Sequence, residues 1–141
     1  MRTNIKKKLN VILGQMNFKF GPSKIFDEKI IEFLDSLSKE ILKNKKNFSY
    51  PDLITFAFWC RRSNLVKLSG NYNNKFFMLG RGTVLHITPS NVPMNFSYSL
   101  AFGLLSGNNN IVRLPSRNFI QVKLFCETIS KIFKQAKFHK I

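Results

Sequence analysis

Two cysteines and the lack of a long apolar run are the first limits on this 141-residue sequence. Cys60 and Cys126 are too few for a disulfide scaffold or for a zinc site with four thiolate ligands. A membrane helix needs about 20 apolar residues, whereas the longest run here, Leu53–Cys60, has eight residues including Thr55. The basic start of the chain is not followed by a signal-like apolar segment. We therefore expect a cytoplasmic protein without a membrane span.

Acidic residues are also scarce: 7 Asp and Glu stand against 23 Lys and Arg, which gives a formal net charge of +16. Such an excess favours nucleic acid or another anionic partner. The cations are nevertheless spread along the chain, and only Lys6–Lys8 and Lys43–Lys46 are dense clusters. The richness in Lys, Asn, Ile and Phe is typical of a bias across a whole proteome. We therefore do not favour nucleic acid, and a basic module that binds nucleic acid or an acidic carrier stays as the alternative from another class.

The sequence has enough apolar residues for a folded core, because 44% of its residues are hydrophobic and 15 are Phe. Met1–Pro22 is interpreted as an irregular basic arm. Ser23 is predicted to cap a helix that continues to about Asn44, since its hydroxyl can accept from a first-turn amide. Apolar residues recur every three or four positions on one face of this helix: Phe26, Ile30, Phe33, Leu34, Leu37 and Ile41. Pro51 then opens a second, buried helix over about Asp52–Ser63.

A strand–helix–strand–helix order follows Gly80, beyond a turn-rich segment at Gly70–Asn74. The expected ranges are a strand at Thr83–Thr88, a helix at Met94–Leu105, a strand at Asn110–Leu114 and a helix at about Phe119–Lys137. Ser116 or Asn118 is expected to cap the last helix. This order predicts an α/β fold in which two parallel strands are joined by a right-handed crossover. Because two parallel strands do not make a stable sheet alone, we expect a fragment of a longer protein.

Common catalytic and ligand-binding motifs do not fit this pattern. Gly80-Arg81-Gly82 precedes its strand, whereas a dinucleotide loop follows one. His86, in mid-strand, and the two cysteines are expected to be packed core residues. In an open α/β sheet, ligands bind beyond the carboxyl ends of the strands, which here are Ile87–Pro93 and Arg113–Arg117. The residues alone therefore predict a ligand crevice of unspecified chemistry at these two segments.

Two longer motifs, Gly82–Pro93 and Leu105–Ser116, contain these segments. They resemble the start of the cofactor domain of the aldehyde dehydrogenase superfamily, with its Pro-Trp-Asn-x-Pro and Gly-Asn-x-Val-Val-x-Lys-Pro-Ser-Glu patterns. The chain is more similar to the acyl-CoA reductase branch, which includes the fatty-acid reductase of bacterial bioluminescence and has His-Ile-x-Pro-x-Asn-Val-Pro as its first motif. Tyr50–Arg61 is similar to that branch too. The resemblance implies an N-terminal arm with helices (1–79) and the first part of a Rossmann-type dinucleotide-binding domain (80–141).

The resemblance also implies roles for residues of the first motif. Asn91 falls on the family's asparagine, whose side-chain amide donates to the oxyanion that forms on the reacting carbonyl. Four residues fall on the strand end that runs under the nicotinamide side of the dinucleotide: Ile87, Thr88, Pro89 and Ser90. We expect the turns after both strands to face one bound dinucleotide.

The second motif bears on the choice of cofactor. Arg113 falls on the family lysine that meets the adenosine ribose, and Ser116 stands where many NAD-preferring members have Glu. A carboxylate there would repel a 2′-phosphate, whereas Ser116 does not, and Arg113 and Arg117 add positive charge. We therefore expect NADPH rather than NADH as the cofactor.

The implied reaction is reduction of an acyl-CoA thioester to the aldehyde, with acyl-CoA or an acyl-protein as substrate and a homo-oligomer as the complete enzyme. The family's nucleophilic cysteine lies well downstream of both motifs. Neither Cys60 nor Cys126 matches it, so the fragment should be inactive alone, and no metal site is expected. Within the same fold, the alternative is an aldehyde dehydrogenase that oxidises an aldehyde with NAD(P).

Overall fold

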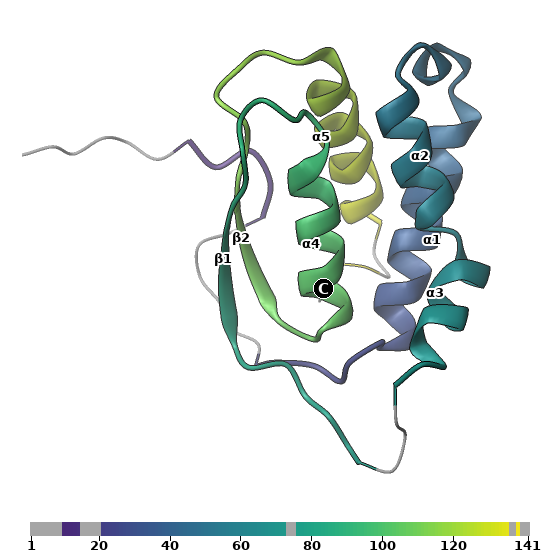
Figure 1. Ribbon diagram of the computed structural model, residues 1–141, viewed down its shortest axis with the longest axis vertical. Coiled ribbons are helices and arrows are strands. Elements are labelled where there is room, and N and C mark those ends of the chain that lie inside the picture. The colour runs from purple at the N-terminus through teal and green to yellow at the C-terminus, as the bar shows by residue number, and fades with distance from the viewer. Residues whose placement is uncertain (1–9, 15–20, 73–75, 136–137, 139–141) are drawn as a thin grey trace, which may run out of the picture.

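The computed structural model describes residues 10–14, 21–72, 76–135 and 138, and it shows a mixed α/β fold (Figure 1). Its elements are α1 (Glu28–Lys43), the 3-10 helix η1 (Lys45–Ser49), α2 (Pro51–Trp59), α3 (Arg62–Ser69), β1 (Thr83–Ile87), α4 (Asn95–Leu105), β2 (Asn109–Arg113) and α5 (Ile120–Phe133). The helix α4 packs on the two strands, and α1 packs against α4, α5, α2 and α3. The fold is therefore layered, with the sheet on one side and α1, α2 and α3 on the other (Figure 1). None of the helices in these ranges is long and apolar enough to cross a bilayer.

The first helix has the expected amphipathic pattern but not the expected start. Its buried apolar residues keep the spacing of three and four: Ile30, Phe33, Leu34, Leu37 and Ile41. The helix begins at Glu28, and its N-cap is Asp27, whose Oδ1 accepts a hydrogen bond from the Lys29 backbone N–H at 2.9 Å. The prediction that Ser23 caps this helix is therefore wrong.

Ser23 is held by other backbone partners, which explains the difference. Its N–H donates to the Gly107 carbonyl at 2.8 Å, and its carbonyl accepts from the Gly80 N–H at 2.9 Å. A Cβ on Gly80 would lie 2.0 Å from the Gly107 carbonyl oxygen, so only glycine permits this approach. The segment before α1 therefore runs past the residues that precede both strands.

The second predicted helix is divided in two. Pro51 does stand at the start of α2, but α2 ends at Trp59 and the chain turns before α3 begins at Arg62. The backbone N–H of Arg62 donates to Asp35 Oδ1 of α1 at 2.9 Å. A side chain 27 positions away thus satisfies a first-turn amide of α3, and local patterns in the sequence do not reveal such a partner.

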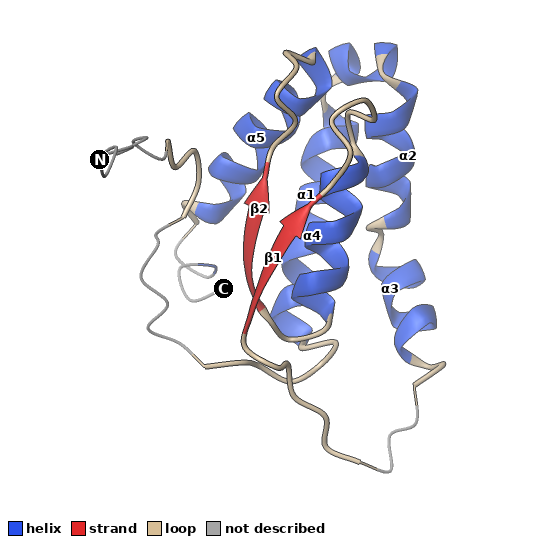
Figure 2. Ribbon diagram, turned by 60° about the vertical axis from the view of Figure 1, so that its left-hand side comes forward, coloured by secondary structure: helices blue, strands red, loops and turns tan. Residues whose placement is uncertain are grey.

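The two strands are parallel, as predicted, with Thr83 paired to Asn109 and Ile87 to Arg113. The second strand begins at Asn109, one residue before the predicted start. Side chains alternate between the two faces of the sheet, and 59% of Leu85 and 65% of Ile87 are exposed on the face away from α4. The described helices all lie on the opposite face (Figures 1 and 2).

The last helix is shorter than expected and lacks a side-chain cap. It spans Ile120–Phe133 with Phe119 at its N-cap, so the predictions that Ser116 or Asn118 caps it are wrong. Phe119 packs against the apolar core, whereas Ser116 and Asn118 are exposed. The helix therefore starts after a residue that packs on the core, and no side chain caps it.

One apolar core joins the helices, and residues on both sides of position 80 contribute to it. Phe125 of α5 is central, because its ring lies 5.5 Å from that of Phe56 and 5.3 Å from that of Phe96 in edge-to-face geometry. Phe33 of α1 likewise meets the ring of Phe133 of α5 at 6.3 Å and that of Phe138 at 5.3 Å. These ring pairs connect α1, α2, α4 and α5.

The observed N-cap predicts that alanine substitutions at Asp27 and Ser23 differ in their effect on the free energy of unfolding. We expect Asp27→Ala to lower the free energy of unfolding by about 1 kcal/mol, because it removes the acceptor for the Lys29 amide and a negative charge near the start of α1. Ser23→Ala is the matched control, since Ser23 contributes backbone hydrogen bonds that alanine keeps. Urea unfolding of both variants tests this, and a larger cost for Ser23→Ala would contradict the assignment.

Candidate functional site

The turns that follow β1 and β2 lie at one edge of the sheet. The strands are parallel, so their carboxyl ends point the same way (Figure 2), and Ile87 pairs with Arg113 at that end. Asn91, Arg113 and Ser116 are exposed there. The fold thus brings together the two segments from which we predicted a ligand site.

The two faces of the sheet separate the residues of this edge. His86 and Asn110 bond to one another on the α4 side. Since side chains alternate along a strand, Arg113 and its partner Ile87 belong to the uncovered face. Asn91 lies beyond β1, in the turn that leads into α4. The Arg113 side chain therefore extends from the uncovered face of the sheet, whereas the Asn91 turn leads to the N-terminal end of α4.

A cavity of about 270 Å³ lies beside the Asn91 turn. Its lining residues come from α2, from the turn that leads into α4 and from the first turn of α4: Asp52, Thr55, Val92, Met94, Asn95 and Tyr98. Asp52 is already engaged, since its Oδ1 accepts from the Leu53 N–H at 2.9 Å and its Oδ2 from Gln121 Nε2 at 3.1 Å. Burial raises the pKa of Tyr98, with smaller effects from Cys60 and Asp52, so its hydroxyl stays protonated. The wall combines apolar surface with hydroxyl groups and the already bonded carboxylate of Asp52.

A hydrogen-bond network holds α4 against both strands beneath this edge. His86 Nδ1 lies 2.7 Å from Ser99 Oγ of α4, and His86 Nε2 lies 2.8 Å from Asn110 Oδ1 of β2. Gly103 of α4 makes room for the contact, because a Cβ there would lie 2.0 Å from Asn110 Oδ1 and 2.8 Å from His86 Nε2. The prediction of a packed histidine is therefore confirmed: His86 is half-buried, and each of its ring nitrogens makes a hydrogen bond.

The network also fixes the tautomer of His86. Asn110 Nδ2 donates to the Asn108 carbonyl at 2.7 Å, so the Asn110 oxygen is the atom turned toward the histidine. An oxygen only accepts, and His86 Nε2 must therefore carry the proton. In the neutral ring, Nδ1 then accepts from the Ser99 hydroxyl.

Thr88, the first residue after β1, has an unusual environment. Its Oγ1 is hidden from solvent and has no hydrogen-bond partner among the described residues. An unpaired buried hydroxyl costs about 1–3 kcal/mol, so a polar ligand group at this strand end would be stabilising. The residue type and its position fit a cofactor site.

Neither thiol is suited to nucleophilic chemistry. Cys60 is completely buried, and its burial raises the thiol pKa strongly. Burial raises the pKa of Cys126 as well, with a further contribution from the Glu127 carboxylate. Cys60 is a core residue, as predicted, whereas Cys126 is half-buried against the core and its predicted structural role stays a prediction. His139 lies outside the described residues.

The family comparison falls on this same region. Residues 71–137 match the family described as acyl-CoA reductase (LuxC). This part of the chain is LuxC-like. The matched range contains both strands, α4 and both turns, and it confirms the predicted resemblance to the acyl-CoA reductase branch over these residues. No curated protein and no solved structure matches the chain.

None of the six residues that line this cavity was among the predicted site residues, although four of them follow Asn91 directly in the sequence or stand in the first turn of α4. Asp52 and Thr55 stand in the first turns of α2, far from both motifs in the sequence. The only signal for them is the similarity of Tyr50–Arg61 to the acyl-CoA reductase branch. That similarity marks the helix without saying which of its residues lies beside the Asn91 turn.

The His86 network predicts that a small side chain at Gly103 is destabilising. Gly103→Ala improves helix propensity by about 1 kcal/mol, yet we expect a net loss of about 1–3 kcal/mol, because the new methyl group displaces Asn110 and His86. Gly70→Ala is the control, since its Cβ would meet only ordinary contacts, the nearest at 3.4 Å. Urea unfolding measures both, and a Gly103→Ala variant as stable as the parent would refute the close contact.

Proposed function

We propose that the chain is the N-terminal part of an NADPH-dependent acyl-CoA reductase with a Rossmann-type cofactor domain. The observation that carries the proposal is the LuxC match over residues 71–137, which includes both turns at the carboxyl edge of the sheet. In open α/β sheets this edge is where ligands bind. The proposed substrate is an acyl-CoA or acyl-protein thioester, and the proposed cofactor is NADPH.

The residues at the strand ends fit a dinucleotide. Thr88 offers a buried hydroxyl without a partner, within the segment Ile87–Ser90 that we assign to the nicotinamide side. Arg113 and Arg117 are exposed cations, and Ser116 between them adds no negative charge. Arginine guanidinium groups bind phosphate through paired N–H donors. When bound, NADPH would supply the hydride that reduces the acyl carbon.

Asn91 would act on the carbonyl oxygen of the acyl group. Its side-chain amide is exposed at the turn, and such a donor contributes about 3 kcal/mol when it meets the charge that develops on this oxygen. The cavity lined by Val92, Met94 and Tyr98 lies next to it and would receive the acyl chain. The turn would thus hold the reacting carbonyl between an amide donor and an apolar wall.

The nucleophile of the reaction is neither of the two cysteines. In the proposed sequence a cysteine thiolate outside this chain attacks the thioester and releases coenzyme A, and hydride transfer then gives the aldehyde. Overall, acyl-CoA, NADPH and one proton give aldehyde, coenzyme A and NADP⁺. The 141 residues alone are therefore proposed to bind ligands without turnover.

The choice of cofactor is tested by Ser116. We expect the chain to bind NADPH at least about tenfold more tightly than NADH, since charge-assisted hydrogen bonds to a phosphate contribute about 1.5–3 kcal/mol. Ser116→Glu should abolish this preference by repelling the 2′-phosphate, whereas Ser116→Ala should keep it. Fluorescence titration of the bound nicotinamide measures all three. Equal or tighter binding of NADH by the parent chain would overturn the NADPH assignment.

The reaction itself is tested with Asn91 in the complete reductase. Asn91→Ala should lower kcat for aldehyde formation from acyl-CoA and NADPH by about 100- to 1000-fold, with little change in the Kd for NADPH. Asn118→Ala, an exposed asparagine after β2, is the matched control. Acid formation from aldehyde and NAD(P) as the faster reaction would instead identify an aldehyde dehydrogenase.

A further inference from the structure

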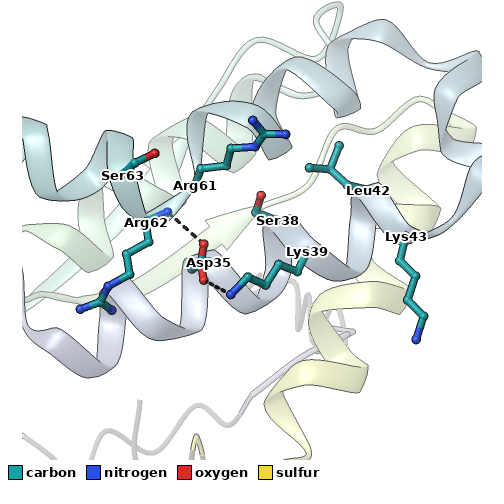
Figure 3. A pocket seen from close by; sticks show the side chains of 8 residues that line it. All are labelled: Asp35, Ser38, Lys39, Leu42, Lys43, Arg61, Arg62 and Ser63. Atoms are coloured by element: carbon teal, nitrogen blue, oxygen red, sulfur yellow. Dashed lines mark hydrogen bonds and ion pairs between the residues drawn. The ribbon is translucent and has the colours of Figure 1, made fainter.

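A cavity larger than the one beside the turn after β1 lies between α1 and the junction of α2 with α3 (Figure 3), with a volume of about 570 Å³. Its charged groups are paired or point apart. Asp35 Oδ2 lies 2.6 Å from Lys39 Nζ, and Asp35 Oδ1 accepts from the Arg62 backbone N–H. Figure 3 shows Lys43 extending away from Arg61. The smaller cavity has the more specific geometry.

The smaller cavity lies between the first turns of two helices. Asp52 at the start of α2 and Asn95 at the start of α4 both line it. Seven residues further along each helix, the rings of Trp59 and Phe102 lie 5.1 Å apart. The two helices therefore run in the same direction from the cavity, and the surface between them continues from the lining residues to this ring pair.

Tyr98, about one helical turn after Asn95, closes the cavity on its inner side. The lining residues include Tyr98 but not Trp59. The Tyr98 ring nevertheless lies only 5.7 Å from the Trp59 ring. The Tyr98 ring therefore separates the cavity from the aromatic surface further along the two helices.

Contacts with the core hold the Tyr98 ring in place. Its centroid lies 5.1 Å from that of Phe56, with 90° between the ring planes, and it meets Trp59 at 63°. Phe56 is itself buried and packs against Phe125 of α5. A ring that packs edge to face against two others cannot turn aside without loosening a close-packed core. Tyr98 is therefore a fixed wall of the cavity.

Aromatic surface continues behind this wall. Phe102 stands four residues after Tyr98 on the same face of α4, and 49% of it is exposed. The half-buried Trp59 ring contacts both of these rings. Removal of the Tyr98 ring would join the cavity to this surface and lengthen it by about one helical turn, or about 5 Å.

We propose that Tyr98 is a specificity-determining residue, which limits the length of acyl chain that the cavity encloses. The proposal rests on the proposed function, because that function places the acyl chain of the thioester in this cavity. Each buried methylene group strengthens binding about fourfold, so affinity rises with chain length while the added carbons enter the cavity. Carbons beyond the Tyr98 ring stay in water, and the rise ends at a defined length.

The test is a titration of the chain with saturated acyl-CoA thioesters, from butyryl-CoA to hexadecanoyl-CoA in steps of two carbons. Binding is read from the fluorescence of Trp59, which is the only tryptophan of the chain and adjoins the Tyr98 ring. For the parent chain we expect the Kd to fall with each step and then to reach a constant value.

Two substitutions of Tyr98 separate its ring from its hydroxyl. In Tyr98→Ala the fall in Kd should continue for at least two more carbons, so that hexadecanoyl-CoA binds at least about tenfold more tightly than it binds the parent. Tyr98→Phe keeps the ring and should keep the parent profile.

Two substitutions in α2 complete the test. Thr55→Phe adds a ring to the cavity from an exposed position, so the fall in Kd should end at a shorter chain. Phe58→Ala is the control, since it removes an exposed ring that stacks on Arg61 and does not line the cavity, and it should keep the parent profile. If circular dichroism shows Tyr98→Ala to be unfolded, Thr55→Phe decides the test.

Three results would overturn the proposal: a parent Kd that is independent of chain length, a parent-like profile in Thr55→Phe or in folded Tyr98→Ala, or the same lengthening in Tyr98→Phe as in Tyr98→Ala. The proposed function is read separately, from the binding of NADPH. Chain-length dependence without NADPH binding would contradict the reductase and leave Tyr98 as the end of an alkyl-binding cavity. NADPH binding without chain-length dependence would overturn the role of Tyr98 alone.

Discussion

The contact of α4 with the sheet is the constraint on which the rest of the structure depends. A two-stranded parallel sheet is weak by itself, and here His86 bonds to a serine of the helix on one side and to Asn110 of the neighbouring strand on the other. The glycine at position 103 lets the helix approach closely enough for these bonds to form. Because the two strands and the helix are fixed together, the turns after both strands keep a defined relation to each other.

The helical layers behind α4 stabilise this unit through apolar burial. Rings of α2 and α4 meet Phe125 of α5 edge to face, Phe33 of α1 meets Phe133 of α5, and α1 contacts every other helix of the described fold. The sheet receives this support on one face only. Leu85 and Ile87 remain more than half exposed on the other face, which in parallel sheets is ordinarily covered as well.

The sequence predicted the elements whose signals are local. Short segments that end at a proline, the first of them β-branched and apolar, located both strands. Pro51 located the start of α2, and the two motifs located the turns that the LuxC match covers. Signals that depend on distant partners were missed. Ser23 resembles an N-cap, but its backbone is committed to Gly80 and Gly107, so Asp27 takes that role. The first amide of α3 is bonded by Asp35 of α1, and the spacing of apolar residues along the sequence does not predict such a contact between helices.

The complete enclosure of Cys60 has a practical consequence. Its thiol lies in the core formed by α1 and α2, where no reagent reaches it while that core is closed. Alkylation of Cys60 therefore requires the packed helices to separate, and its rate depends on how often the protein reaches such open states. Cys60 therefore reports the opening of the helical core, and the half-buried thiol of Cys126 supplies a reference rate within the same chain.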